Sequence, residues 1–243
     1  IIMGDDESNS FLLASQGNEY LYVIPMVRHL TEDEAERIVE GYMRIAEHDF
    51  EIETKLLDIS KIKDYNRDYA NQSTEFTYSR FLIPYLENYE GFSIFIDNDY
   101  IWKRTPLPFF YFLDPDHAVA CVQYDFEHHD SVKMGGEVNI SYPKKLWSSM
   151  MIFNNGHEDC KKLTPEVINN QSGKYLHQFE WTDKISKIPH GKIATEGFET
   201  ECLDSHHAVH YTRGGPWIKG MDYSNINMLE QFYKVKSTLP TNK

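Results

Sequence analysis

One stretch decides the fold class of this chain: Phe92-Ser93-Ile94-Phe95-Ile96-Asp97-Asn98-Asp99. Its first five residues predict a short buried β-strand, and two carboxylates one residue apart follow that strand. Because alternate side chains of extended backbone point to the same side, we expect Asp97 and Asp99 to face one ion together. Carboxylates are hard oxygen ligands that hold a divalent cation and its phosphates. The competing interpretation is an ordinary Asp-Asn-Asp turn, and other segments decide between the two.

The composition limits the classes of protein that fit. With 243 residues, 41% hydrophobic and 14% aromatic, the chain can bury a large core, and we predict a single domain over residues 1–233 followed by a tail over 234–243. A formal net charge of −14 argues against nucleic acid as a partner, because phosphate backbones are bound by clustered Lys and Arg. An acidic protein that handles phosphates requires a metal ion. Nothing in the sequence specifies an oligomeric state.

Targeting signals are also missing from the sequence as given. Its longest apolar runs fall short of the roughly 20 residues that span a bilayer, and its first residues lack the basic flank of a signal peptide. The three cysteines, Cys121, Cys160 and Cys202, are odd in number and far apart, which fits neither a disulfide framework nor a zinc site. We therefore expect a soluble protein in a reducing compartment, the cytoplasm.

The order of elements predicts an α/β fold. Helical spacing or capping signals occur near residues 8–13, 31–48 and 78–86, and the pattern at 31–48 begins with a capping box, Thr31-Glu32-Asp33-Glu34. Pro84 is expected to kink the third helix or to lie near its end. Strands alternating with helices favour a mainly parallel, Rossmann-like central sheet flanked by helices, with ligands at the carboxyl ends of its strands. The expected strands are residues 1–3, 20–24, 92–96, 118–123, 148–154 and 208–211.

A second group of candidate functional residues is His210-Tyr211-Thr212-Arg213-Gly214-Gly215-Pro216-Trp217. Neutral imidazole is a good ligand for Mn²⁺, and the glycine pair lets backbone approach a ligand closely. Trp217 is placed to pack against a ring. The alternative is a Gly-Gly-Pro turn with a core histidine at 210, and His206 and His207 compete for the ligand role.

Several segments, in order, resemble the family 8-like glycosyltransferases. These are enzymes of GT-A fold related to glycogenin and to bacterial lipopolysaccharide glycosyltransferases, so the resemblance implies a GT-A type single domain. It covers most of the chain from Ser73 to Trp217. The segments are residues 2–7, 73–86, 95–99, 142–149, 163–166, 175–181 and 210–217.

The resemblance implies a role for each matching residue. Asp97, Asp99 and His210 would be ligands of Mn²⁺ or Mg²⁺, which bridges the donor diphosphate and acts as a Lewis acid. Arg80 would reach the donor, and Asp183 would lie beside the anomeric carbon as a catalytic group. The other implied donor contacts are Gly4, Asp5, Asn98, Ser149, Asn154, Gly214, Gly215 and Trp217.

This chain also departs from the family pattern. Family 8 members commonly have a lysine before the final Pro-Trp to hold the diphosphate, and Gly215 stands there instead. Arg213 or Lys219 is the candidate substitute. The expected helix at 31–48 resembles an insertion relative to the bacterial enzymes.

The function that the resemblance implies is metal-dependent transfer of a sugar from a nucleoside diphosphate sugar, a UDP-sugar, to a glycan or glycoconjugate acceptor. Anomeric configuration would be retained, with the leaving phosphate accepting the acceptor proton. The alternative is a carbohydrate-binding or scaffold protein of the same fold with decayed catalysis. A metal-dependent hydrolase is a further alternative, whereas the acidic segment Gly4-Asp5-Asp6-Glu7 argues against a sugar-phosphate nucleotidylyltransferase.

Overall fold

The computed structural model describes residues 14–16, 19–21, 59–67, 77–97, 99–104, 106–124, 131–132, 138–139, 144, 146–213, 215–216 and 226–238. The helices expected at 8–13 and 31–48 and the strand expected at 1–3 lie outside these residues. So do Gly4, Asp5, Asn98, Gly214 and Trp217.

A four-stranded mixed sheet carries the stretch that decides the fold. Its order is β3 (Phe92–Ile96), β8 (Met150–Asn154), β5 (Val119–Val122) and β9 (Ile185–Ile188). β8 pairs antiparallel with both β3 and β5, and β5 pairs parallel with β9. In the described part of the chain the sheet is therefore mixed: β3, β5 and β9 run in one direction and β8 in the other, so the expected parallel arrangement is present in part. Parallel neighbours need a crossover connection, usually a helix, whereas the chain leaving β3 enters a second sheet instead.

That second sheet has three described strands in the order β10 (Ile193–Thr195), β11 (Ala208–His210) and β4 (Tyr100–Trp102). β10 and β11 are parallel, and β4 is antiparallel to β11. Consequently β3 and β4, which follow each other in the sequence, belong to different sheets.

Alternation of side chains explains how the two sheets pack. Ile94 and Ile96 of β3 enter one buried cluster with Tyr100, Trp102 and residues of β11 and β10, so this cluster fills the space between the sheets. Phe95 points the other way, into a cluster formed with the helices. On the far face of the second sheet, alternate residues such as Val209 pack with Met228 and Phe232 of α5 (Ile226–Thr238).

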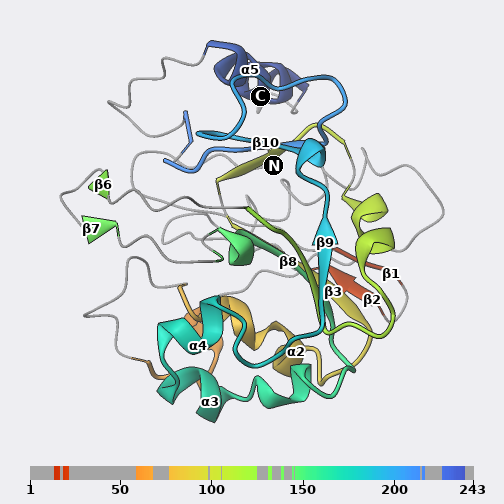
Figure 1. Ribbon diagram of the computed structural model, residues 1–243, viewed down its shortest axis with the longest axis vertical. Helices are drawn as coiled ribbons and strands as arrows, with labels where there is room; N and C mark the ends of the chain where they lie inside the picture. Colours follow the sequence, from red (N-terminus) through yellow and green to blue (C-terminus); the bar gives the residue numbers. More distant parts are fainter. Residues whose placement is uncertain are drawn as a thin grey trace.

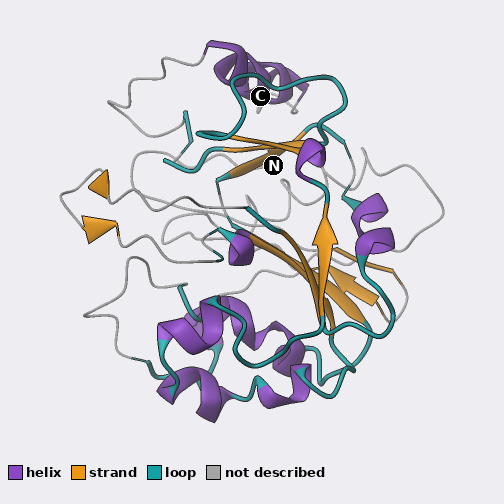
Figure 2. Ribbon diagram, viewed as in Figure 1, coloured by secondary structure: helices purple, strands orange, loops and turns teal. Residues whose placement is uncertain are grey.

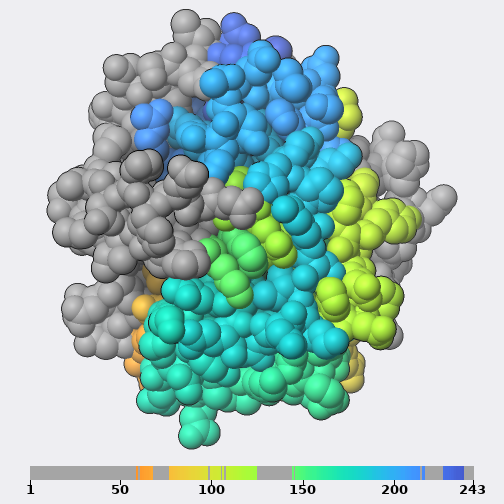
Figure 3. Space-filling view, viewed as in Figure 1, coloured from red at the N-terminus to blue at the C-terminus, as the bar shows by residue number. Residues whose placement is uncertain are grey.

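The result is four layers, shown in Figures 1 and 2: the helices α2 to α4, the four-stranded sheet, the three-stranded sheet and α5. In Figure 3, α5 and the segments near it form one end of the molecule, and the region of α3 and α4 forms the other. No helix among the described residues has both the length and the apolar character needed to cross a membrane.

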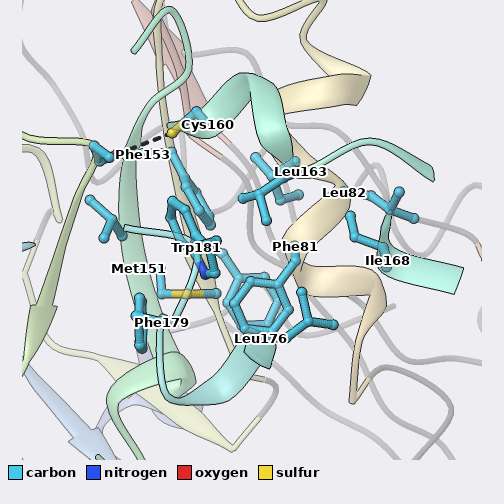
Figure 4. Packing of buried hydrophobic residues seen from close by; sticks show 14 of the residues in the cluster. Phe81, Leu82, Met151, Phe153, Cys160, Leu163, Ile168, Leu176, Phe179 and Trp181 are labelled. Atoms are coloured by element: carbon cyan, nitrogen blue, oxygen red, sulfur yellow. Dashed lines mark hydrogen bonds between the residues drawn. The ribbon is translucent and has the colours of Figure 1, made fainter. Parts of the chain in front are cut away.

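The helical layer packs on the outer face of the four-stranded sheet. Phe81 and Leu176 from helices meet Met151 of β8, and the ring of Phe153 lies with its centroid 6.5 Å from that of Trp181 (Figure 4). The short helices of the fold are η1 (Ile59–Lys61), η2 (Ser79–Leu82), α2 (Ile83–Leu86), η3 (Leu107–Phe112), η4 (Trp147–Ser149), η5 (Cys160–Lys162), α3 (Pro165–Asn170), α4 (Gly173–His177) and η6 (His190–Lys192).

The remaining strands are short hairpins. β1 (Ala14–Gln16) pairs antiparallel with β2 (Glu19–Leu21), and this hairpin lies beside β3. β6 (Ser131–Val132) pairs antiparallel with β7 (Val138–Asn139).

Several expected elements are confirmed. The strand predicted at 92–96 has these bounds in the structure, and those predicted at 118–123, 148–154 and 208–211 correspond to β5, β8 and β11. The helix predicted at 78–86 is η2 followed by α2, with Pro84 in the first turn of α2, where its missing N–H costs nothing. α5 continues through Lys234, the expected start of the tail, to Thr238.

Candidate active site

The candidate site lies where the chain passes from one sheet to the other. β3 ends at Ile96 and β4 begins at Tyr100, so Asp97 to Asp99 form the connection between the sheets. The N–H of Asp97 donates to the carbonyl oxygen of Ser149 at 2.7 Å, and the carbonyl oxygen of Asp99 accepts from the N–H of Tyr211 at 2.8 Å. Each end of the connection is thereby held by a different sheet, which fixes the two carboxylates at the junction.

Asp97 is paired with a buried arginine. Arg80 Nη1 lies 2.9 Å from Oδ1 and 3.0 Å from Oδ2 of Asp97, and it also donates to the carbonyl oxygen of Ser148 at 2.8 Å. The guanidinium lies 4.8 Å from the centre of the Phe95 ring. Burial raises the pKa of Asp97, the positive charge of Arg80 opposes that rise, and the charge of Asp99 adds to it. The two acids are therefore close enough to interact, while Arg80 engages only the first of them by hydrogen bonds.

Asp99 faces His210 of β11. Its Oδ1 lies 3.2 Å from His210 Nε2, yet this buried oxygen has no hydrogen-bond partner among the described residues. The histidine is buried, and its ring stacks on Tyr100 with a centroid distance of 4.1 Å and an interplanar angle of 15°. Tyr100 is its cross-strand neighbour in the sheet, so strand register places this stack. The imidazole is held rigidly beside an unpartnered carboxylate oxygen.

This pair suits two ligands of one cation. Two adjacent ligand atoms, each about 2.1 Å from a metal, are about 3.0 Å apart in octahedral and about 3.4 Å apart in tetrahedral geometry. The observed 3.2 Å between Asp99 Oδ1 and His210 Nε2 lies between these values. The parts of the chain that the structure describes contain no group of three or more His, Cys, Asp or Glu side chains arranged to hold a metal. Asp97 faces Arg80 and does not join the pair in this arrangement.

Ser149 lies at the same junction as the carboxylates. Its hydroxyl is hydrogen-bonded to the hydroxyl of Tyr100 at 2.9 Å, and both residues are buried. Burial holds the pKa of Tyr100 well above its usual range, so this phenol stays protonated at neutral pH. The bond links the start of β8 to β4 and so braces the two sheets at the site.

Two residues predicted for the site lie at the other end of the four-stranded sheet. Asn154 pairs with Phe92, whereas the site lies at the Ile96 end of β3, four residue pairs or about 13 Å away. The side-chain amide of Asn154 donates to the carbonyl oxygen of Pro115 at 3.1 Å. Asp183 is exposed and lies just before β9. The first residue of β9 pairs with Val119 of β5, which pairs with Phe153, the neighbour of Asn154, so Asp183 lies at the same far end of the sheet. The structure thus does not bring Asn154 or Asp183 together with Asp97, because the strands that carry them run in directions that sequence patterns do not reveal.

Arg213, one of the two residues proposed to replace the missing lysine, has a partner of its own, whereas Lys219 lies outside the described residues. Arg213 Nη2 lies 2.5 Å from Oε1 of Glu196, which is buried. Gly215 is buried in the same segment.

A group that the sequence reasoning missed lies beside His210. Thr195 is the cross-strand partner of His210 in the parallel pair β10 and β11, and a turn to Glu199 follows it. Burial raises the pKa of Glu199, and a hydrogen bond from the N–H of Thr195, together with the charges of His190 and His210, opposes that rise. The signal in the sequence is Gly197, two residues after the end of the short strand β10; its φ of +92° is one that other residues rarely adopt.

The fold and the site define a mixed α/β protein with a carboxylate and histidine pair at the junction of two sheets. The chain is 38% identical over 174 residues to Protein CDI of Arabidopsis thaliana, a match that covers 67% of each protein, and it belongs to the same family as that protein. None of the protein-family models that were compared matches it.

Two solved structures are similar at a lower level. The apo structure of the bifunctional glycosyltransferase WbbM is 14% identical, with a TM-score of 0.40, over 60% of this chain and 33% of that one. A glycosyltransferase involved in glycosylation of the major capsid of PBCV-1 is 12% identical, with a TM-score of 0.43, over 88% of this chain and 98% of that one. Similarity at these TM-scores specifies neither the fold nor the activity of this chain.

Proposed function

We propose that this protein is a metal-dependent glycosyltransferase that moves a sugar from a nucleoside diphosphate sugar, a UDP-sugar, to a glycan or glycoconjugate acceptor. The observation that carries the proposal is the pair of the partly buried Asp99 and the buried His210, 3.2 Å apart, beside the ion pair of Asp97 and Arg80. The ordered resemblance to family 8-like enzymes supports the same activity.

Asp99 and His210 are the residues that would hold the cation, and their carboxylate and imidazole donors suit Mn²⁺. When bound, such a cation neutralises the donor diphosphate and stabilises the charge on the departing nucleotide. Tyr100 keeps the His210 ring in place by stacking on it. Arg80 acts by orienting Asp97, because its guanidinium is engaged by that carboxylate and by the carbonyl oxygen of Ser148.

The proposed stereochemistry is retention, with the leaving phosphate accepting the proton of the acceptor hydroxyl. This route requires no carboxylate dedicated as a general base, which agrees with the position of Asp183 at the far end of the sheet. The net charge of −14 favours a carbohydrate acceptor over nucleic acid.

Calorimetric titration with UDP, GDP and CDP tests the proposal. We expect UDP to bind in Mn²⁺ and to lose at least 100-fold in affinity in EDTA, and the same loss in Mn²⁺ for Asp99→Asn and His210→Gln. Thermal unfolding of each variant serves as the folding control. Equal UDP binding in Mn²⁺ and in EDTA, or no nucleotide binding at all, would contradict the proposal of a metal-bridged donor site.

A second candidate function is carbohydrate binding without transfer. It is favoured by one observation: Asp97 forms an ion pair with Arg80, whereas Asp99 alone of the two acids is paired with His210. Incubating the protein with UDP-sugars and Mn²⁺ and measuring released UDP separates the two, since a protein that only binds carbohydrate produces none.

A further inference from the structure

The turn after β10 is held rigidly next to His210. The N–H groups of Phe198 and Glu199 both donate to the carbonyl oxygen of Thr195, at 3.0 and 2.9 Å. The carboxylate of Glu199 in return accepts from the N–H of Thr195 at 2.7 Å through Oε2. The N–H of Glu196 donates to the carbonyl oxygen of His210 at 2.9 Å, which ties the turn to β11.

This turn carries an exposed aromatic side chain, Phe198, which packs on the buried ring of Tyr124. Phe198 is 39% exposed, and its ring centroid lies 4.6 Å from that of the buried Tyr124. The Tyr124 ring is flanked by His190 at 5.1 Å, and its hydroxyl is hydrogen-bonded to that of Thr195. The exposed ring is therefore backed by a buried aromatic layer.

We infer that Phe198 and Glu199 form a subsite for a pyranose ring beside the cation site, an inference that rests on the proposed function. One face of a pyranose carries C–H groups and packs well on an aromatic ring, while the hydroxyls at its edge need hydrogen-bond acceptors. Phe198 supplies the ring, and the carboxylate of Glu199 has acceptor capacity beyond its bond to Thr195.

The position of the subsite agrees with this ligand. Thr195 and His210 are cross-strand partners, so the turn begins at the strand end that carries the Asp99 and His210 pair. The Glu199 carboxylate accepts from the N–H of Thr195, the cross-strand partner of His210, so it lies at this strand end. A sugar ring bonded to a diphosphate at the cation site, or a sugar about to be joined to it, must lie within a few ångströms of that pair.

The experiment compares five variants with the wild type after a check of thermal unfolding. Phe198→Ala and Phe198→Leu remove the ring, Phe198→Tyr keeps it, and Glu199→Gln removes the charge but keeps an acceptor for Thr195. Tyr111→Ala is the matched control, because it removes an aromatic ring that is 89% exposed and lies outside this group. The probes are UDP, UDP-glucose, UDP-galactose and UDP-xylose in Mn²⁺ by calorimetry, and an array of neutral oligosaccharides.

We expect UDP to bind all variants within twofold of the wild type. If the subsite holds the transferred sugar, Phe198→Ala, Phe198→Leu and Glu199→Gln lose about 10-fold in affinity for the preferred UDP-sugar, whereas Phe198→Tyr and Tyr111→Ala do not. If it holds an acceptor sugar, the same variants lose retention on the array and keep their UDP-sugar affinity.

Failure of the subsite and failure of the proposed function give different results. The subsite is wrong if these variants match Tyr111→Ala in both assays, or if the wild type neither prefers any UDP-sugar over UDP nor retains any oligosaccharide. Loss of UDP binding by the wild type counts against the proposed function alone, since retention on the array still tests Phe198 and Glu199.

Discussion

Nη1 of Arg80 lies 2.9 and 3.0 Å from the two carboxylate oxygens of Asp97, and the same nitrogen donates to the carbonyl oxygen of Ser148 at 2.8 Å. Arg80 is 8% exposed, and the carboxylate of Asp97 compensates its charge inside the fold. The pair joins η2 of the helical layer to the connection between the two sheets. It thereby holds the first acid of the site while leaving the second free to face His210.

This relationship predicts a strong coupling between the two residues. Arg80→Met leaves the Asp97 carboxylate uncompensated and should lower the free energy of unfolding by about 3 kcal/mol. Adding Asp97→Asn should recover at least about 1 kcal/mol, as measured by urea denaturation in a double-mutant cycle. Lys161→Met, which breaks the exposed pair with Glu158, is the control and should leave the free energy of unfolding nearly unchanged. Additive effects of the two mutations at Arg80 and Asp97 would show that the pair is not coupled.

The position of the acids predicts different outcomes at two aspartates. Asp99→Asn should abolish Mn²⁺-dependent UDP binding, because Asp99 faces His210 at the junction. Asp183→Asn should leave UDP affinity and turnover within twofold of the wild type, because Asp183 precedes β9 at the opposite end of the sheet. Equal losses in the two variants would mean that the carboxyl group of Asp183 reaches the donor after all.

His177 predicts a loss of stability in acid. Its Nδ1 is hydrogen-bonded to Ser148 Oγ at 2.8 Å, its ring packs against Phe81, and burial lowers its pKa to about 3. Between pH 3 and the ordinary value near 6.5 the unfolded chain binds the extra proton, so stability falls as the pH drops, by up to about 1.4 kcal/mol per unit. Urea denaturation from pH 8 to pH 4 should show a shallower slope for His177→Asn. An unchanged slope would assign the acid sensitivity to other groups.

Glu87 predicts the opposite dependence. It is 4% exposed, and burial raises its pKa to about 7. Between about pH 4.5, the ordinary pKa of the group, and pH 7, the folded chain keeps a proton that the unfolded chain releases. The ionisation of Glu87 in the unfolded chain therefore lowers the stability of the protein as the pH rises through this range. Glu87→Gln should stabilise the protein more at pH 8 than at pH 5, as measured by urea denaturation at the two pH values. A constant difference between the two conditions would contradict the raised pKa.

Local patterns in the sequence predicted the elements that carry the site. The apolar run at 92–96 is β3, the segment 78–86 is helical, and His210 ends the strand expected at 208–211. Asp97, Asp99 and His210 were singled out from local patterns and Arg80 from the family resemblance, and the structure joins them as two neighbouring pairs. Burial of one face and polar residues at a strand end leave a clear local signature, so these features are readable without tertiary information.

Only the tertiary structure decided which strands are neighbours and in which direction they run. β8 lies antiparallel between β3 and β5, which sends Asn154 and Asp183 to the far end of the sheet, and parallel pairing of β10 with β11 brings the turn at Glu199 beside His210. The residues between Ile96 and Tyr100 cross from one sheet to the other, so Asp97 and Asp99 face different partners. A strand of either direction shows the same alternation of side chains, and its partners are chosen by packing between distant segments, which no local pattern encodes.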